Sequence, residues 1–251
     1  MATHQEQVDR DLLRIASYNI HRCVGTDMKS DVARVGRVIQ EMGCDTIGLQ
    51  EVDHTAGGQS ESMQLDYLAK LTGMEPVAGP TILRHEGHYG NALLTRRRIL
   101  DVRRHDLSYR GYEPRGALEV DLEASGRAIR VIVMHLGLFP AERRYQVKKI
   151  LTLLRAIPVE QPVIVLGDIN EWLPIGRPLR WLHGLMGKPP RERSFPVYAP
   201  MFALDRVWVR PRSALMSFSV HRSADARRAS DHFPVKAVID PETLPRWYRK
   251  E

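Results

Sequence analysis

The chain has 251 residues, enough for one large α/β domain or two small ones, and its 43% hydrophobic and 27% charged residues are ordinary globular values. Two cysteines are too few for a disulfide-stapled secreted scaffold. The polar N-terminus lacks the apolar core of a signal peptide, and no window approaches the roughly 18 apolar residues that span a bilayer. The formal charge of +7 favours anionic partners, and we expect a cytoplasmic protein without a transmembrane segment.

The first third of the chain alternates predicted strands and helices. Apolar runs with polar ends predict strands over Leu12–His21 and Asp45–Asp53. Hydrophobic residues at helical spacing predict helices over Ser30–Gly43 and Met63–Gly73. The first helix would be capped by its opening serine or the aspartate after it, and its final glycine would end it.

The middle of the chain is rich in predicted strands. Short apolar runs predict strands over Gly90–Arg96, Gly116–Glu123 and Ala128–Leu136. The sequence ASGR between the last two is a plausible hairpin turn. The run TRRRIL (Thr95–Leu100) is predicted to be a turn or a solvated face.

The last third returns to alternating elements. A helix is predicted over Ala141–Ile157, a buried strand over Pro162–Asn170 and a short helix over Pro178–Met186, followed by a Pro/Arg-rich loop over Gly187–Pro200. Three strands close the chain: Ala203–Arg210, Leu215–Val220 and Phe233–Asp240. This order indicates one α/β domain with mixed sheets covered by helices.

Several apolar strands end in side chains suited to metal or phosphate chemistry, and the last strand is preceded by two more. They are Asn19, Glu51, His135, Asp168, Asn170, Asp231 and His232. If the strand stays extended to residue 170, Asp168 and Asn170 share one face. Each residue alone could be a turn, cap or packing residue. Because ligands gather at the carboxyl ends of strands in α/β sheets, the set indicates a functional site.

The donor types narrow the chemistry of that site. Asn19, Glu51 and Asp231 offer hard oxygen ligands, and the chain has no Cys/His cluster with zinc spacing, which favours Mg²⁺ or Mn²⁺. A Ser–His–Asp hydrolase is a rival interpretation because Ser230, Asp231 and His232 are consecutive. Adjacent residues rarely reach triad geometry, and the chain has no G-x-S-x-G elbow.

Eight motifs together carry a family resemblance. SYNIH, LQEVD, GNALLTR, RGALEVDL, MHLGL, GDIN, LDRVWV and SDHFPV occur in the order typical of the endonuclease/exonuclease/phosphatase superfamily. The chain resembles its branch of small bacterial proteins with YNIH and GNALL motifs, from about Tyr18 to Val238. The resemblance implies a single domain over 1–251, with 1–11 and 241–251 as peripheral tails. It also implies a DNase-I-like four-layered α/β/β/α sandwich of two packed mixed sheets, and divalent-metal-dependent cleavage of a phosphoester.

The resemblance also implies roles for individual residues. Glu51 would be the principal metal ligand, helped by Asn19 and Asp231. Asp168 would orient or deprotonate the attacking water, and Asn170 would fix the water or a phosphate oxygen.

Further roles concern the phosphate. His232 would contact it as an acid–base group or charge stabiliser, with its tautomer fixed by Asp205. Whether Asp168 or the His232–Asp205 pair is the general base stays open. His135 would face a phosphate oxygen or the leaving group. Asn91 and Arg115 would bind substrate, although a loop hydrogen bond and a surface ion pair are comparable alternatives for these two.

The substrate is less defined than the chemistry. A phosphodiester of DNA, RNA or a phospholipid headgroup is expected, with a small phosphomonoester as the alternative. A catalytically retired protein that binds nucleic acid or a phosphorylated ligand is a third possibility. Arg246–Lys250 (RWYRK) could touch a membrane surface peripherally. No obligate protein partner is predicted, and the oligomeric state is left open.

Overall fold

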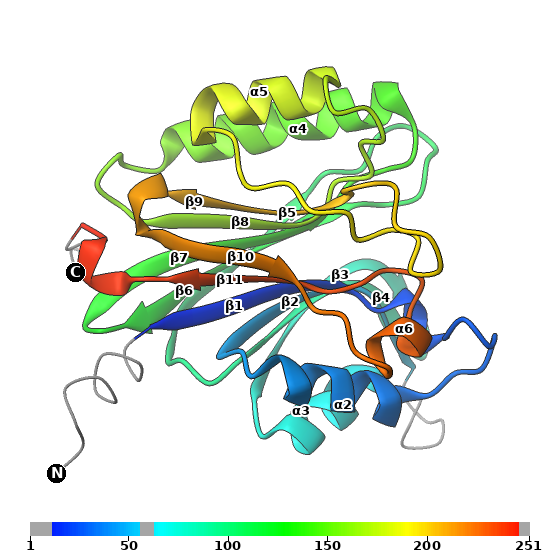
Figure 1. Cartoon of the computed structure of the whole chain (residues 1–251). Coiled ribbons are helices and arrows are strands. Elements are labelled where there is room, and N and C mark those ends of the chain that lie inside the picture. The colour runs from blue at the N-terminus through cyan, green and yellow to red at the C-terminus, as the bar shows by residue number, and fades with distance from the viewer. Residues whose placement is uncertain (1–11, 56–62, 246–251) are drawn as a thin grey trace, which may run out of the picture.

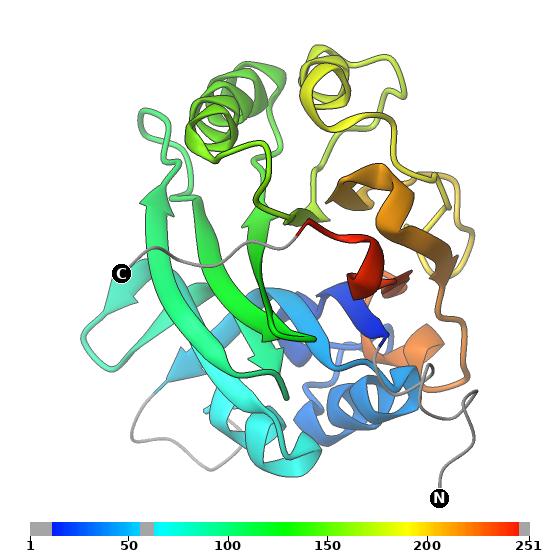
Figure 2. The ribbon, with the colours of Figure 1, turned by 90° about the vertical axis from the view of Figure 1, so that its left-hand side faces the viewer.

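Two mixed β-sheets pack face to face, and helices cover both outer faces (Figures 1 and 2). The computed structural model describes residues 12–55 and 63–245. In spatial order the first sheet contains β10 (Leu215–Val220), β11 (Val235–Ile239), β1 (Leu13–Asn19), β2 (Thr46–Thr55), β4 (Gly87–Thr95) and β3 (Glu75–Arg84). The second sheet contains β5 (Ile99–Asp106), β6 (Gly116–Ala124), β7 (Arg127–His135), β8 (Val163–Asp168) and β9 (Asp205–Arg210).

The helices form the outer layers. They are α2 (Val32–Met42) and α3 (Gln64–Thr72) on the first sheet, α4 (Pro140–Ala156) and α5 (Arg177–Met186) on the second, and the short α6 (Ala226–Ala229) beside α2. Three 3₁₀ turns complete the described elements: His21–Cys23, Arg212–Ala214 and Pro241–Thr243. The expected four-layered α/β/β/α sandwich is confirmed. Among the described residues, no helix combines the length and apolar character needed to cross a bilayer.

The buried apolar residues form three clusters. One cluster fills the space between the sheets, and two more lie under the helix pairs. The sheets approach closely at Gly48 on β2, where an added Cβ would lie 2.2 Å from Leu166 Cδ1 on β8. Glycine is required there by this approach of the two sheets rather than by a turn.

Local signals predicted most elements correctly. Asp31 caps α2 by accepting a hydrogen bond from the Arg34 amide at 2.8 Å, and Gly43 ends the helix with φ of 60°. The β6–β7 hairpin turns at Ser125 and Gly126, which both have positive φ.

Two edge strands were missed by the sequence prediction. β3 contains two prolines and pairs with β4 alone, which is where a sheet tolerates proline. β5 begins at Ile99, so the turn predicted over Thr95–Leu100 is shorter than expected. The charged residues within β5 obscure the strand pattern, and β5 forms the edge of the second sheet.

The structure describes part of the C-terminal segment but not the N-terminal one. Leu244, in the segment predicted as a peripheral tail, is buried in the core between the sheets, and Glu242 pairs with Arg127 at 2.9 Å. Residues 1–11 and the predicted membrane contact at Arg246–Lys250 lie outside the described residues.

Candidate active site

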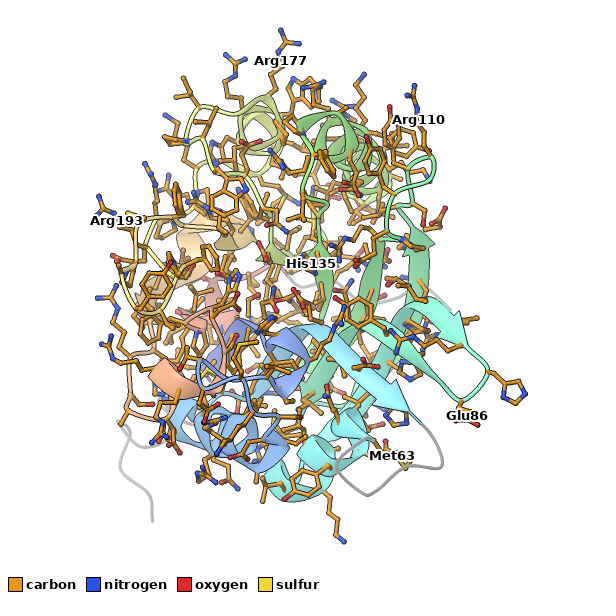
Figure 3. All side chains as sticks on the ribbon, turned by 90° about the vertical axis from the view of Figure 1, so that its right-hand side faces the viewer. Met63, Glu86, Arg110, His135, Arg177 and Arg193 are labelled. Carbon is orange, nitrogen blue, oxygen red and sulfur yellow. The ribbon has the colours of Figure 1, made fainter. Side chains whose placement is uncertain are left out.

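Strand register brings the predicted site residues to one edge of the sandwich. β1 and β2 are parallel and place Asn19 beside Gln50, next to Glu51. β7 and β8 are also parallel and place His135 opposite Asp168. Figure 3 faces this edge and shows His135 near its centre. The carboxyl ends of strands from both sheets therefore meet here, as the sequence predicts.

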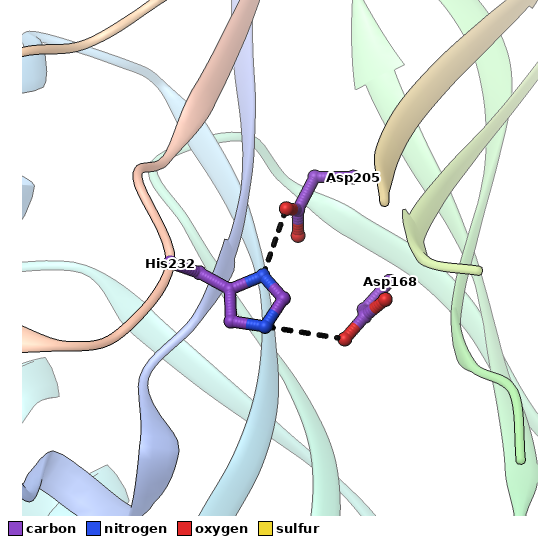
Figure 4. Close-up of side chains that lie close together, drawn as sticks. All are labelled: Asp168, Asp205 and His232. Atoms are coloured by element: carbon purple, nitrogen blue, oxygen red, sulfur yellow. Dashed lines mark hydrogen bonds and ion pairs between the residues drawn. The ribbon is translucent and has the colours of Figure 1, made fainter. Parts of the chain in front are cut away.

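Asp168 lies at the centre of this cluster. Its Oδ2 accepts a hydrogen bond from Asn19 Nδ2 at 3.1 Å and lies 3.5 Å from His135 Nε2 and 3.7 Å from His232 Nε2 (the last contact is drawn in Figure 4). Three polar side chains, from β1, β7 and the segment before β11, thus surround one carboxylate oxygen at the end of β8. The Asp168 side chain is almost fully buried.

Asn170 reaches the cluster by a different route from the predicted one. β8 ends at Asp168, and Asn170 has a left-handed φ of 50°, so strand alternation does not place these two residues on a common face. Instead the backbone N–H of Asn170 donates to Asp168 Oδ1 at 2.9 Å. The side-chain Nδ2 of Asn170 donates to the Leu136 carbonyl at 2.9 Å and lies 3.0 Å from His135 Nε2. The turn, not the strand, joins Asn170 to the site.

A buried chain of hydrogen bonds holds His232. Asp205 Oδ2 accepts from His232 Nδ1 at 2.9 Å (Figure 4). It also accepts from Ser194 Oγ at 2.5 Å. Asp205 lies on β9 directly opposite Asp168, because β8 and β9 are antiparallel neighbours. With its Nδ1 facing Asp205, the ring presents Nε2 to Asp168. This is the orientation expected for a histidine whose tautomer a carboxylate fixes.

The two central groups carry perturbed pKa values. Burial raises the pKa of Asp168 to about 6, against the lowering influence of His232 and of hydrogen bonds from Asn170 and Asn19. Burial alone would lower the pKa of His232, but the Asp205 and Asp168 carboxylates raise it to about 10. Near neutral pH the arrangement therefore favours an ionised Asp168 beside a protonated His232.

The side chains predicted to bind a metal differ in their distance from the central cluster: Asn19 and Glu51 adjoin it, and Asp231 does not. Asn19 Nδ2 donates to Glu51 Oε1 at 3.0 Å as well as to Asp168, so Glu51 adjoins the central cluster. Glu51 occupies an irregular point in the β2–β4 pairing, with φ of 59°, and its side chain is half-buried. Asp231 lies further out, 40% exposed, with Oδ1 3.9 Å from His21 Nδ1.

This donor set fits a divalent cation of the Mg²⁺ type. Asp168, Asp205 and His232 each have a polar atom within 4.8 Å of the others, but a protonated His232 offers no lone pair, so oxygen atoms would hold the cation. Asp205 Oδ1 is buried without a hydrogen-bond partner among the described residues. Glu51 adds another carboxylate at the same edge. Carboxylate-rich oxygen sites suit Mg²⁺ and Mn²⁺, which keep several water ligands.

A narrow cavity opens beside the cluster and contains the two predicted substrate residues. Its walls include Glu51, Tyr89, Asn91, Arg115 and His135. Arg115 is buried, and its Nη1 lies 3.1 Å from His135 Nδ1 and 2.9 Å from Glu113 Oε1. An arginine only donates, so His135 accepts with Nδ1, and its pKa is lowered well below the ordinary value by burial and by Arg115 and His232.

Asn91 has one hydrogen bond that serves the fold. Its Nδ2 donates to the Gly116 carbonyl at 2.9 Å, which ties β4 to β6 across the sandwich. Its side chain still lines the cavity with Arg115, so the structural and substrate-binding interpretations are compatible.

Two serines support the site. Ser194 was not predicted, because backbone pairing of its loop with Phe202 brings it to Asp205 and nothing in its local sequence marks it. Ser230 Oγ donates to the Asn19 carbonyl at 2.7 Å and accepts from the His232 amide at 3.2 Å. Ser230 therefore fixes backbone around the site, and its contacts do not form a Ser–His–Asp triad.

Comparison with known sequences defines the class of protein. The model of the Endonuclease/Exonuclease/phosphatase family matches residues 16–232, so the chain belongs to this family. The chain is similar to the uncharacterised protein YbhP of Escherichia coli K12, with 29% identity over 93% of this chain and 98% of that protein.

Comparison with solved structures agrees with the fold. An endonuclease/exonuclease/phosphatase from Beutenbergia cavernae is 22% identical with a TM-score of 0.71, covering 94% of this chain and 72% of that one. A mannosyl-6-phosphatase from Bacteroides thetaiotaomicron is 18% identical with a TM-score of 0.70, covering 90% and 99%. D. rerio TDP2, solved with a single-strand DNA product, is 17% identical with a TM-score of 0.67, covering 90% and 98%. At these identities the likeness concerns the fold.

Proposed function

We propose that the protein hydrolyses a phosphodiester with a bound Mg²⁺ or Mn²⁺ ion. The observation that carries the proposal is the environment of Asp168, a buried carboxylate in contact with Asn19, His135 and His232 at the edge where the strands of both sheets end. Such a rigid constellation can hold a water in line with a phosphorus atom. Family membership supports the phosphoester as the bond that is cleaved.

The residues divide the chemistry between them. Asp168 is the general base that accepts the proton of the attacking water, because it is the ionised member of the Asp168–His232 pair. His232, held by Asp205, donates hydrogen bonds to the phosphate and stabilises its developing charge. Asn170 positions the water or a phosphate oxygen. Arg115, beside an uncharged His135, offers a guanidinium to the phosphate.

The metal would be held by Glu51 and Asn19, with Asp231 at the exposed side. When bound there, it would neutralise charge on the phosphate and on the leaving oxygen. Arg22 lies close enough to interact electrostatically with Glu51, whereas Arg115 lies beside His135 on the other side of the cavity.

The narrow cavity beside the site has no room for a water-sized molecule, so the rest of a substrate would occupy the space next to it. A second cavity of about 250 Å³ adjoins the first and shares Thr81, Arg115 and Gly116 with it. Its wall also contains Arg104 and His105. This adjoining space could hold one ester group of a diester.

Metal removal tests the proposal directly. In excess EDTA, hydrolysis of bis(p-nitrophenyl) phosphate should fall at least ~10³-fold and return when Mg²⁺ or Mn²⁺ is restored. Saturating metal should raise the melting temperature of the wild type by about 5 °C, and Glu51→Gln should lose most of this shift. Glu123→Gln, which alters an exposed carboxylate on β6, is the matched control. Equal turnover in the chelator would contradict the proposal, and faster turnover of p-nitrophenyl phosphate would reassign the substrate to monoesters.

A further inference from the structure

Exposed apolar side chains gather around the catalytic edge. Among the described residues, fourteen large hydrophobic side chains are exposed, and seven of them lie in the connections that leave β7 and β8 or lead into β9. These seven, which we call the apolar rim, are Leu138, Phe139, Trp172, Leu173, Ile175, Tyr198 and Met201. Leu173, Ile175 and Tyr198 are 63%, 75% and 79% exposed. Soluble monomers rarely leave a contiguous apolar surface without a partner.

Contacts between side chains join part of the rim into one surface. A groove of about 410 Å³ has Leu138 on one side and Trp172 and Leu173 on the other. The Trp172 ring contacts the rings of Phe202 at 4.8 Å and Phe195 at 5.6 Å.

The same surface reaches the catalytic cluster. The Phe195 ring lies 4.6 Å from the ring of His232, measured between centroids. At the other end of the rim, Phe139 contacts Tyr112 at 5.0 Å, and Tyr112 is itself exposed. Ring contacts therefore link Trp172 of the rim to the catalytic histidine through Phe195, and Phe139 of the rim to the β5–β6 connection.

Arginines surround this apolar surface. Arg110, Arg177 and Arg193 are exposed and lie near the periphery of the face that has His135 near its centre (Figure 3). Within the described part of the chain, Arg177 and Arg193 form no ion pair with a carboxylate. The nearest acidic side chain of the groove, Glu171, is buried and paired with Arg143 at 3.3 Å. The rim thus combines apolar tips with exposed arginines.

We infer that the apolar rim and its arginines dock the catalytic edge on an anionic lipid bilayer, where the site meets a phosphoester of a membrane lipid. The choice of lipid as substrate rests on the proposed function, whereas the docking does not. Leucine, isoleucine, methionine and tryptophan at loop tips can enter the boundary between headgroups and acyl chains, and arginines beside them attract anionic headgroups. Single-stranded nucleic acid fits less well, because bases bind by stacking on rings and four of the seven rim residues are aliphatic.

Vesicle sedimentation tests the docking without any turnover. The full chain should sediment with vesicles of phosphatidylcholine mixed with phosphatidylglycerol, less with phosphatidylcholine alone, and less as salt is raised. The double variant Leu173→Gln/Ile175→Gln removes apolar surface without changing charge and should bind about tenfold more weakly. Val159→Gln/Met216→Gln is the matched control, because both residues are exposed but lie away from the rim, and it should bind as the wild type does.

The outcomes separate the docking from the proposed chemistry. The inference is wrong if the wild type ignores anionic vesicles, if the control variant loses binding equally, or if the rim variant loses binding to single-stranded DNA and not to vesicles. Hydrolysis of the soluble diester is measured on the same samples. If that activity is absent while the rim variant alone loses vesicle binding, the docking stands and the proposed hydrolysis fails.

Discussion

Two groups of buried carboxylates in this molecule differ in the cationic side chains that contact them. On the outer part of the second sheet, Glu119 and Asp121 of β6 are paired with arginines: Arg130 binds Asp121 through two nitrogens at 2.7 and 2.8 Å, and Arg103 lies between both carboxylates. At the catalytic edge, Asp168 and Asp205 are equally buried but share one histidine. Among the described residues, no arginine or lysine forms an ion pair with either.

The difference shows which buried charge is structural. A buried carboxylate that an arginine neutralises contributes to the fold, and removing one partner leaves an uncompensated charge. Two buried carboxylates with a single shared histidine leave part of their charge unbalanced, which suits a site that binds a cation and a proton. The position of arginines therefore separates the supporting charges of this protein from the reactive ones.

Matched substitutions in the two groups should give the largest effects, one on turnover and the other on the free energy of unfolding. Asp168→Asn should lower turnover of the diester at least ~10³-fold and leave the free energy of unfolding unchanged or higher, because it removes a desolvated charge. Glu119→Gln should keep turnover within about twofold but lower the free energy of unfolding by roughly 2–4 kcal/mol, because Arg103 and Arg130 lose part of their neutralisation. Diester hydrolysis and urea unfolding of both variants provide the comparison. The distinction would fail if Asp168→Asn destabilised the fold as much as Glu119→Gln or stayed active.

A further substitution, Asp205→Asn, tests whether Asp205 acts through His232. Asp205→Asn should lower kcat about 10²- to 10⁴-fold with a smaller change in KM, because the imidazole loses the carboxylate that orients it. The pKa of His232 should also fall, since Asp205 is the main group that raises it, and an NMR titration of the ring measures this. Asp121→Asn, in the arginine-paired group, should affect neither quantity. An unchanged His232 titration would reduce Asp205 to a packing residue.

Much of the fold was predictable because it depends on local patterns. Apolar runs marked the buried strands β1, β2, β7 and β8, and capping residues marked the limits of α2. The edge strands β3 and β5 were missed because proline in one and repeated charges in the other obscure strand periodicity. Pairing with a neighbouring strand, rather than local pattern, makes these segments extended.

The site was predictable at the level of which strand ends it uses, but not in its connections. The rule that ligands gather at strand ends led to Asn19, Glu51, His135 and Asp168, which the structure brings together. The left-handed turn at Asn170 depends on backbone conformation, and the bond from Ser194 to Asp205 depends on the pairing of its loop with Phe202. Neither leaves a mark in the nearby sequence.

The smallest expected effect concerns pH and again separates the two groups. The pKa of His232 is raised from its ordinary 6.5 to about 10 in the folded chain, so the proton binds more tightly there than in the unfolded chain. That stabilisation is fully present below about pH 6.5 and is lost as pH rises toward 10. The arginine partners of Glu119 and Asp121 do not titrate in this range, and His105, which contacts Glu119 Oε2 at 2.7 Å, is present in both proteins compared. In EDTA, the free energy of unfolding should therefore fall from about pH 6 to about pH 9 by roughly 1–3 kcal/mol more in the wild type than in His232→Gln. Urea unfolding at both pH values measures it, and parallel curves for the two proteins would show that His232 is not held protonated by Asp205 and Asp168.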